Sequence, residues 1–123
     1  MGATKRGKAI EEILSVTEYN DWWYCGKEMN GYFPVVDFQK DLEVVSLKTI
    51  DPRSASYANG KADAKIMDYM DDLKRSEITI GDDPNVTKIL DVRVPKNTKQ
   101  MLDIDELEKY AIKNEITIEI KEF

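Results

Sequence analysis

The 123 residues are enough for one domain with a single hydrophobic core, which we expect to span 1–123. There is no histidine and only one cysteine, Cys25, which excludes Ser-His-Asp and Cys-His catalysis, an internal disulfide and a Cys-rich zinc site. The net charge of −6 at pH 7 argues against a general nucleic-acid-binding surface, because Lys and Arg supply most non-specific affinity for phosphates. Any catalysis must therefore use carboxylates, lysine, hydroxyls and a hard metal ion.

The first half of the chain predicts one helix and one β-hairpin. Residues 4–16 are expected to be helical, with Ile10, Ile13 and Leu14 as the apolar side. Glu11 lies at the border of that stripe, where it could reach a site over a sheet. Residues 19–32 are rich in aromatics and predict irregular structure. Two β-type runs follow at 33–38 and 42–49, and a three-residue polar turn joins them.

The second half predicts alternating helices and strands. Residues 61–75 carry apolar side chains at spacings of three and four, which indicates a helix. A strand is expected at 86–94, a helix at 104–113 begun by an Asp103–Glu106 capping box, and a strand at 116–122. The last three form a βαβ unit with parallel strands. The expected fold is therefore α/β (α+β), a mixed sheet flanked by helices in the order α-β-β-α-β-α-β, like a restriction-endonuclease core.

The hairpin carries the residues that indicate function. Asp37 lies near the end of its first strand, whereas Ser46 and Lys48 share one face of the second because strand side chains alternate. A carboxylate on one strand, and a lysine two residues after a polar residue on the next, are typical of metal-dependent nucleases of the restriction-endonuclease type.

The chain resembles the C-terminal nuclease domains of contact-dependent growth inhibition toxins and related polymorphic toxins, which have the PD-(D/E)xK endonuclease fold. The matching stretches, in chain order, are 6–11 (RGKAIE), 33–38 (FPVVDF), 45–51 (VSLKTID), 56–57 (SY), 69–71 (YMD), 90–95 (LDVRVP), 110–111 (YA) and 116–118 (ITI). The resemblance implies a DNA endonuclease with Zn²⁺ or Mg²⁺ at its site and a cognate immunity protein. It also implies delivery as part of a larger secreted or surface toxin that acts in the cytoplasm of a target bacterium.

The resemblance and the chemistry of phosphodiester hydrolysis together assign a role to each candidate residue. Asp37 and Glu11 would hold a divalent metal (Mg²⁺, Mn²⁺ or Zn²⁺), and Glu12 is the alternative to Glu11. Ser46 stands where many relatives carry a second carboxylate, and Lys48 would stabilise the transition state. Supporting positions and nucleic-acid contacts complete the set: Thr49 and Asp51 behind the ligands, and Arg53, Tyr57 and Lys61 as contacts to the substrate.

Three functions remain open at this point. The first is a metal-dependent DNase toxin domain. The second is a tRNA-cleaving toxin on the same fold, because a fold does not determine its substrate. The third, a non-enzymatic acidic inhibitor of the phage type or a nucleic-acid mimic, agrees with the charge but leaves Lys48 beside Asp37 unexplained.

Overall fold

The computed structural model describes residues 3–24, 36–57, 59–78, 80, 83 and 85–123. Its elements are α1 (Ala3–Ser15), β1 (Trp23–Tyr24), β2 (Phe38–Lys40), β3 (Glu43–Thr49), α3 (Lys61–Arg75), β4 (Thr87–Val94), α4 (Ile104–Lys113) and β5 (Thr117–Glu122), with two 3₁₀ turns, η1 (Ala55–Tyr57) and η2 (Lys99–Met101). Over these residues the strands form a five-stranded mixed sheet in the order β1-β2-β3-β4-β5. The predicted α+β class with a mixed sheet flanked by helices is thereby confirmed.

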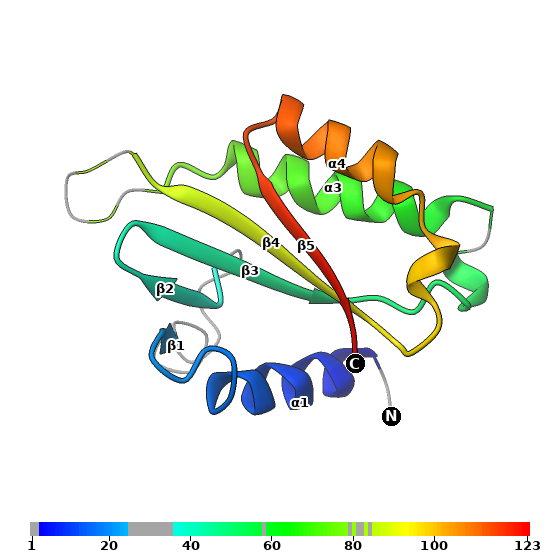
Figure 1. The fold of residues 1–123 in the computed structure, drawn as a ribbon, viewed down its shortest axis with the longest axis horizontal. Coiled ribbons are helices and arrows are strands. Elements are labelled where there is room, and N and C mark those ends of the chain that lie inside the picture. The colour runs from blue at the N-terminus through cyan, green and yellow to red at the C-terminus, as the bar shows by residue number, and fades with distance from the viewer. Residues whose placement is uncertain (1–2, 25–35, 58, 79, 81–82, 84) are drawn as a thin grey trace.

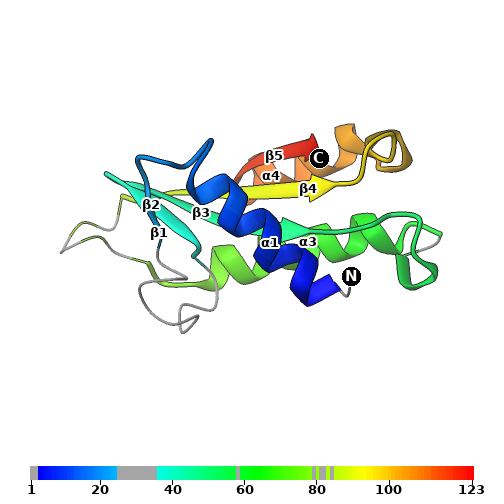
Figure 2. The same cartoon turned by 90° about the horizontal axis from the view of Figure 1, so that it is seen from below.

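The sheet separates two helical layers (Figures 1 and 2). Helices α3 and α4 lie side by side on one face, over Leu90, Val92 and Val94 of β4. Helix α1 crosses the other face, where Leu14 packs with Val45 and Leu47 of β3. Alternation along the strands produces this division, because successive side chains point to opposite faces.

The hairpin is shorter than predicted and shifted along the chain. The expected strand at 33–38 begins instead at Phe38, and 33–35 lie outside the described residues. Gln39 and Lys40 were expected in the turn but pair with β3, where Lys40 faces Glu43 as an opposite-charge pair. The turn is therefore two residues long, and Asp41 adopts the left-handed conformation (φ 52°) that aspartate tolerates. Strand β1, which pairs with β2, was not predicted.

The parallel half of the sheet follows the prediction closely. β4 pairs parallel to β3 and β5 pairs parallel to β4, which confirms the βαβ unit. Helix α3 spans the predicted residues, with Ala62, Ile66, Met70 and Leu73 buried. Helix α4 also begins where predicted, and the Asp103 side chain accepts a hydrogen bond from the backbone N–H of Glu106 at 3.2 Å. Within the described residues, no helix combines the length and the apolar character needed to cross a membrane.

A buried polar network joins the end of α1 to the middle of the sheet. Asp91 and Arg93 of β4 point to the α1 face and are almost fully buried. Arg93 donates to both carboxylate oxygens of Asp91, at 2.7 and 2.8 Å, and to both oxygens of Glu18, at 3.2 and 2.7 Å. The hydroxyl of Tyr19 also donates to Asp91, and Lys121 of β5 donates to Glu18 at 3.3 Å. The turn after α1 is therefore tied to the two last strands.

Candidate active site

An open groove of about 340 Å³ lies at the edge of β3, between the layers of α1 and α3. Its lining comes from both helical layers and from the strand between them: Gly7, Lys8 and Glu11 of α1, Leu47, Lys48 and Thr49 of β3, Tyr57 of η1 and Tyr69 of α3. Four of the predicted residues, Glu11, Lys48, Thr49 and Tyr57, thus line one groove.

Asp37 is held beside this groove by two hydrogen bonds to β3. Its backbone N–H donates to the carbonyl of Val45 at 2.8 Å, which continues the hairpin ladder by one step. Its carboxylate oxygen Oδ2 then accepts the backbone N–H of Leu47 at 2.7 Å, where a regular β2 would have offered a carbonyl. The side chain of Asp37 therefore replaces the strand at the point where the β2–β3 ladder ends.

The electrostatics place Glu11 and Lys48 near Asp37. Burial and the negative charge of Glu11 raise the pKa of Asp37 to about 7, whereas the N–H of Leu47 and the charge of Lys48 oppose the rise. The phenol of Tyr24 is also close, because its pKa is raised by burial, by a hydrogen bond with Glu11 and by the charge of Asp37. The structure therefore brings two carboxylates, a lysine and a phenol to one place, and close carboxylates resist simultaneous ionisation.

Lys48 is held from the side of α3. Its Nζ lies 5.2 Å from the centre of the Tyr69 ring, and the Nζ of Lys65 lies 5.1 Å from the same ring. Both distances are within the range of cation–π attraction. Ser46 shares the face of Lys48, but it is only 1% exposed and does not line the groove.

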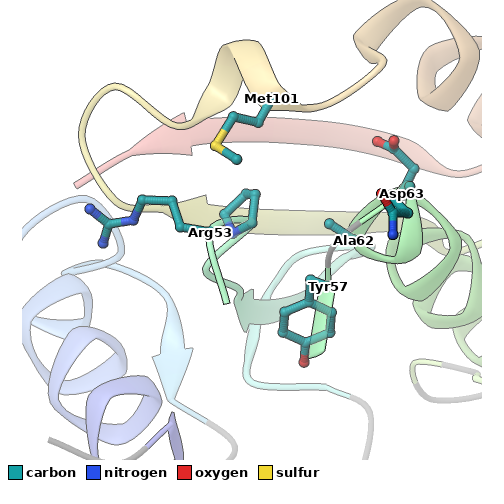
Figure 3. Close-up of a pocket in the computed structure, with 8 residues that line it drawn as sticks. Arg53, Tyr57, Ala62, Asp63 and Met101 are labelled. Atoms are coloured by element: carbon teal, nitrogen blue, oxygen red, sulfur yellow. The ribbon is translucent and has the colours of Figure 1, made fainter. Parts of the chain in front are cut away.

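The remaining candidates are distributed around this site. Glu12 is exposed and does not line the groove, which favours Glu11 over its neighbour. Asp51 binds the guanidinium of Arg53 through two hydrogen bonds of 2.9 and 3.0 Å. Arg53 lines a second pocket of about 260 Å³, which it shares with Tyr57 (Figure 3). Lys61 is exposed at the start of α3 and lines neither of these pockets.

Figure 3 shows the residues that line the second pocket. Met101 and Tyr57 lie on opposite sides of it, and the side chain of Arg53 points away from Asp63. Asp63 accepts a hydrogen bond from the backbone N–H of Asp103 at 3.0 Å, so this carboxylate is used to tie α3 to the start of α4. Of the residues that the structure describes, Tyr57 alone lines both the groove and the second pocket.

Four groove-lining residues were not identified as site residues from the sequence: Gly7, Lys8, Leu47 and Tyr69. Tyr24, which lies close to Glu11 and Asp37 but does not line the groove, was not identified either. Tyr69 has the spacing of a core residue, and Tyr24 belongs to an aromatic cluster that was read as loop structure. Gly7 could have been noticed in the sequence, because a glycine inside a helical pattern often marks a point where another segment packs closely against the helix. A Cβ at Gly7 would lie 3.4 Å from the hydroxyl oxygen of Thr49, so α1 lies close to β3 at this point.

The donor set suits a hard divalent cation better than a structural zinc ion. Within the described ranges no group of three His, Cys, Asp or Glu side chains could hold a metal. Glu11 and Asp37 nevertheless supply two carboxylates, and Mg²⁺ is commonly bound by one or two carboxylates together with water and substrate phosphates. A cation at this point would also relieve the repulsion that raises the pKa of Asp37.

Comparison with known proteins identifies the family. The model of the CDI toxin restriction endonuclease-like domain matches residues 6–121. Among solved structures, a chain of the CdiA-CT/CdiI toxin and immunity complex from Yersinia pseudotuberculosis has the same fold, with a TM-score of 0.66 and 17% sequence identity over 92% of this chain and 97% of that chain. A search of curated proteins finds no match. The match over nearly all of its length shows that this chain belongs to the family of CDI toxin restriction endonuclease-like domains.

Proposed function

We propose that this chain is a metal-dependent endonuclease toxin domain that hydrolyses phosphodiester bonds in DNA. The observation that carries the proposal is the groove lined by Glu11 and Lys48 on the edge of the sheet, with Asp37 beside it and under the influence of both charges. Family membership supports the same reading, because the family is described as restriction endonuclease-like. A non-enzymatic nucleic-acid mimic would have no need of two mutually repelling carboxylates beside a lysine.

Each residue has a distinct part in the proposed reaction. Asp37 and Glu11 would hold the cation, and a bound divalent cation would supply polarisation of the phosphate and a lowered pKa for water. Lys48, with its Nζ against the ring of Tyr69, places a fixed positive charge where negative charge develops on the phosphoryl oxygens. Ser46 is too deeply buried to meet substrate, so it supports the strand that carries Lys48. Thr49 lines the groove from the α1 side.

The experiment that tests this function is a direct comparison of substrates. The purified domain is incubated with plasmid DNA and with total tRNA under the same conditions, in Mg²⁺, Mn²⁺ or Zn²⁺. We expect degradation of the plasmid, and no degradation by the Asp37→Ala variant prepared in parallel. Selective loss of tRNA would assign the chain to RNA instead, and inertness toward both polymers with every metal would refute the nuclease function.

We also propose that the domain is delivered by a larger toxin and is neutralised by a cognate immunity protein. The structural neighbour from Yersinia pseudotuberculosis is part of a toxin and immunity complex, which supports a partner of this kind. A nuclease whose target is also present in its producer must be held inactive there. Co-expression with the product of the adjacent downstream gene should relieve toxicity and yield a stable complex. Free expression of the active domain without a growth defect would contradict this proposal.

A further inference from the structure

Positive charge is concentrated at the groove although the chain as a whole is acidic. The net charge is −6, yet Lys8 and Lys48 both line the groove, and Lys65 lies against its Tyr69 wall. Among the described residues that line it, Glu11 is the single acidic one, and Asp37 lies beside it, so the three lysines outnumber these two carboxyl groups. A locally positive electrostatic field would attract a polyanion even to an acidic protein. The reason is that charges near the groove act on the polyanion more strongly than distant charges, which salt screens.

The three lysines come from the three layers of the fold. Lys8 belongs to α1 on one face of the sheet, Lys48 to β3, and Lys65 to α3 on the other face. The two helices lie on opposite sides of the sheet (Figure 2). A chain of phosphates that passed from Lys8 to Lys65 would therefore cross the sheet edge at Lys48, beside Asp37.

Tyr69 fixes two of these cations. The centre of its ring lies 5.2 Å from the Nζ of Lys48 and 5.1 Å from the Nζ of Lys65. The ring is half-buried and packs against the hydrophobic core under α3, so its position is set by the core and not by the lysines. Asp68 and Asp72 also lie near the ring, but Asp72 is paired with Arg75.

Lys8 and Lys65 are more available to bind phosphate than the neighbouring Arg53. Arg53 is held in a two-pronged contact by Asp51. In contrast, neither Lys8 nor Lys65 forms a salt bridge with another described residue. An ammonium group without a protein carboxylate can exchange its counterions for phosphate at little loss, which is the physical source of nucleic-acid affinity.

We propose that Lys8 and Lys65 bind the DNA backbone phosphates on either side of the one that meets Lys48. The inference rests on the proposed nuclease function and adds the path of the substrate across the sheet edge, from α1 to α3. It also explains how an acidic chain can act on DNA: the binding surface is confined to this groove. Phosphate contacts position the backbone without reading its sequence, so these lysines contribute affinity and not specificity.

The test measures binding without cleavage. The affinity of the full chain for a labelled DNA duplex is measured in excess EDTA at several salt concentrations, for the wild type and for Lys8→Ala, Lys65→Ala and the double variant. Each lost phosphate contact should reduce the slope of log K against log salt by about 0.9, and the double variant should lose about 1.8. Lys109→Ala, an exposed lysine on α4, is the matched control and should leave the slope unchanged.

The outcomes separate this inference from the proposed function. If the wild type cleaves DNA but both single variants keep the full slope, the path is wrong while the nuclease function stands. A reduced slope in only one of them would also overturn the two-sided arrangement. If the wild type neither binds the duplex at low salt nor cleaves it with metal, both proposals fail together.

Discussion

Replacing Asp37 by asparagine should abolish activity and yet stabilise the fold at neutral and alkaline pH. The substitution keeps an oxygen that can accept the N–H of Leu47, a bond of 2.7 Å in the wild type, but it removes the charge. That charge is unfavourable in the folded protein, because burial and Glu11 raise the pKa of Asp37 from 3.8 to about 7. The neutral variant no longer carries this penalty.

The magnitude follows from the raised pKa. Between pH 3.8 and about 7 the folded chain keeps a proton that the unfolded chain has lost, so the stability falls as the pH rises through this window. At about 1.4 kcal/mol per pH unit, the wild type should lose about 4 kcal/mol by pH 8 and about 1.5 kcal/mol by pH 5. The stability difference between Asp37→Asn and the wild type should therefore grow by about 2.5 kcal/mol from pH 5 to pH 8.

Urea unfolding at the two pH values, in EDTA to exclude divalent cations, measures this difference. The pH-dependent part is the diagnostic one, because a change in packing or in the hydrogen bond to Leu47 would add the same amount at both values. Asp68→Asn, an exposed carboxylate on α3, serves as the control and should show almost no such dependence. Equal differences at pH 5 and pH 8 would refute the burial of Asp37 next to Glu11 on which the site is built.

Three further predictions concern the site and the buried network. Lys48→Ala should lower the cleavage rate by about 100-fold or more at an unchanged circular dichroism spectrum, because it removes a positioned positive charge. Ser46→Ala should only reduce the rate. Cleavage at the wild-type rate by the Lys48 variant would refute the proposed mechanism. Excess EDTA should stop cleavage and Mg²⁺, Mn²⁺ or Zn²⁺ should restore it, and undiminished cutting in EDTA would require a metal-free chemistry. Arg93→Met should lower the free energy of unfolding by about 3–5 kcal/mol, because it leaves the carboxylate of Asp91 buried without its ion-pair partner. Arg75→Met breaks an exposed ion pair and should change the free energy of unfolding by less than about 1 kcal/mol. Similar losses in the two variants would contradict the importance of the buried ion pair of Arg93.

The sequence predicts best where a single periodicity dominates. The limits of α3 follow from the regular recurrence of Ala62, Ile66, Met70 and Leu73, and the structure has the same limits. The first strand of the hairpin was misplaced because Gln39 and Lys40 are polar residues that resemble a turn, whereas pairing with β3 is decided across the strands. The local pattern of polar and apolar residues contains no information about which strand will pair with these residues.

The candidate site shows the same division between local and tertiary information. The alternation of side chains along β3 is enough to predict the face on which Lys48 lies. The position of Glu11 at the border of the apolar stripe of its helix is enough to favour it as a site residue over Glu12, which is exposed in the structure. The role of Tyr69 could not be predicted, because an aromatic residue at helical spacing usually belongs to the core. Only the tertiary structure brings its ring close to two lysines. The two-pronged contact of Arg53 with Asp51 was hidden for a related reason, because it depends on the turn between them.

The contacts of Glu18 make the assembly of the site a late event in folding. Glu18 lies just beyond α1, and its partners Arg93 and Lys121 are 75 and 103 residues away along the chain. Contacts between such distant residues form only after long loops have closed, which is slow compared with local helix formation. Helix α1, although it precedes the strands along the sequence, should therefore dock last, after β4 and β5 have joined the sheet. Because α1 carries Glu11, the chain should pass through a nearly folded stage that has Asp37 and Lys48 in place and no nuclease activity.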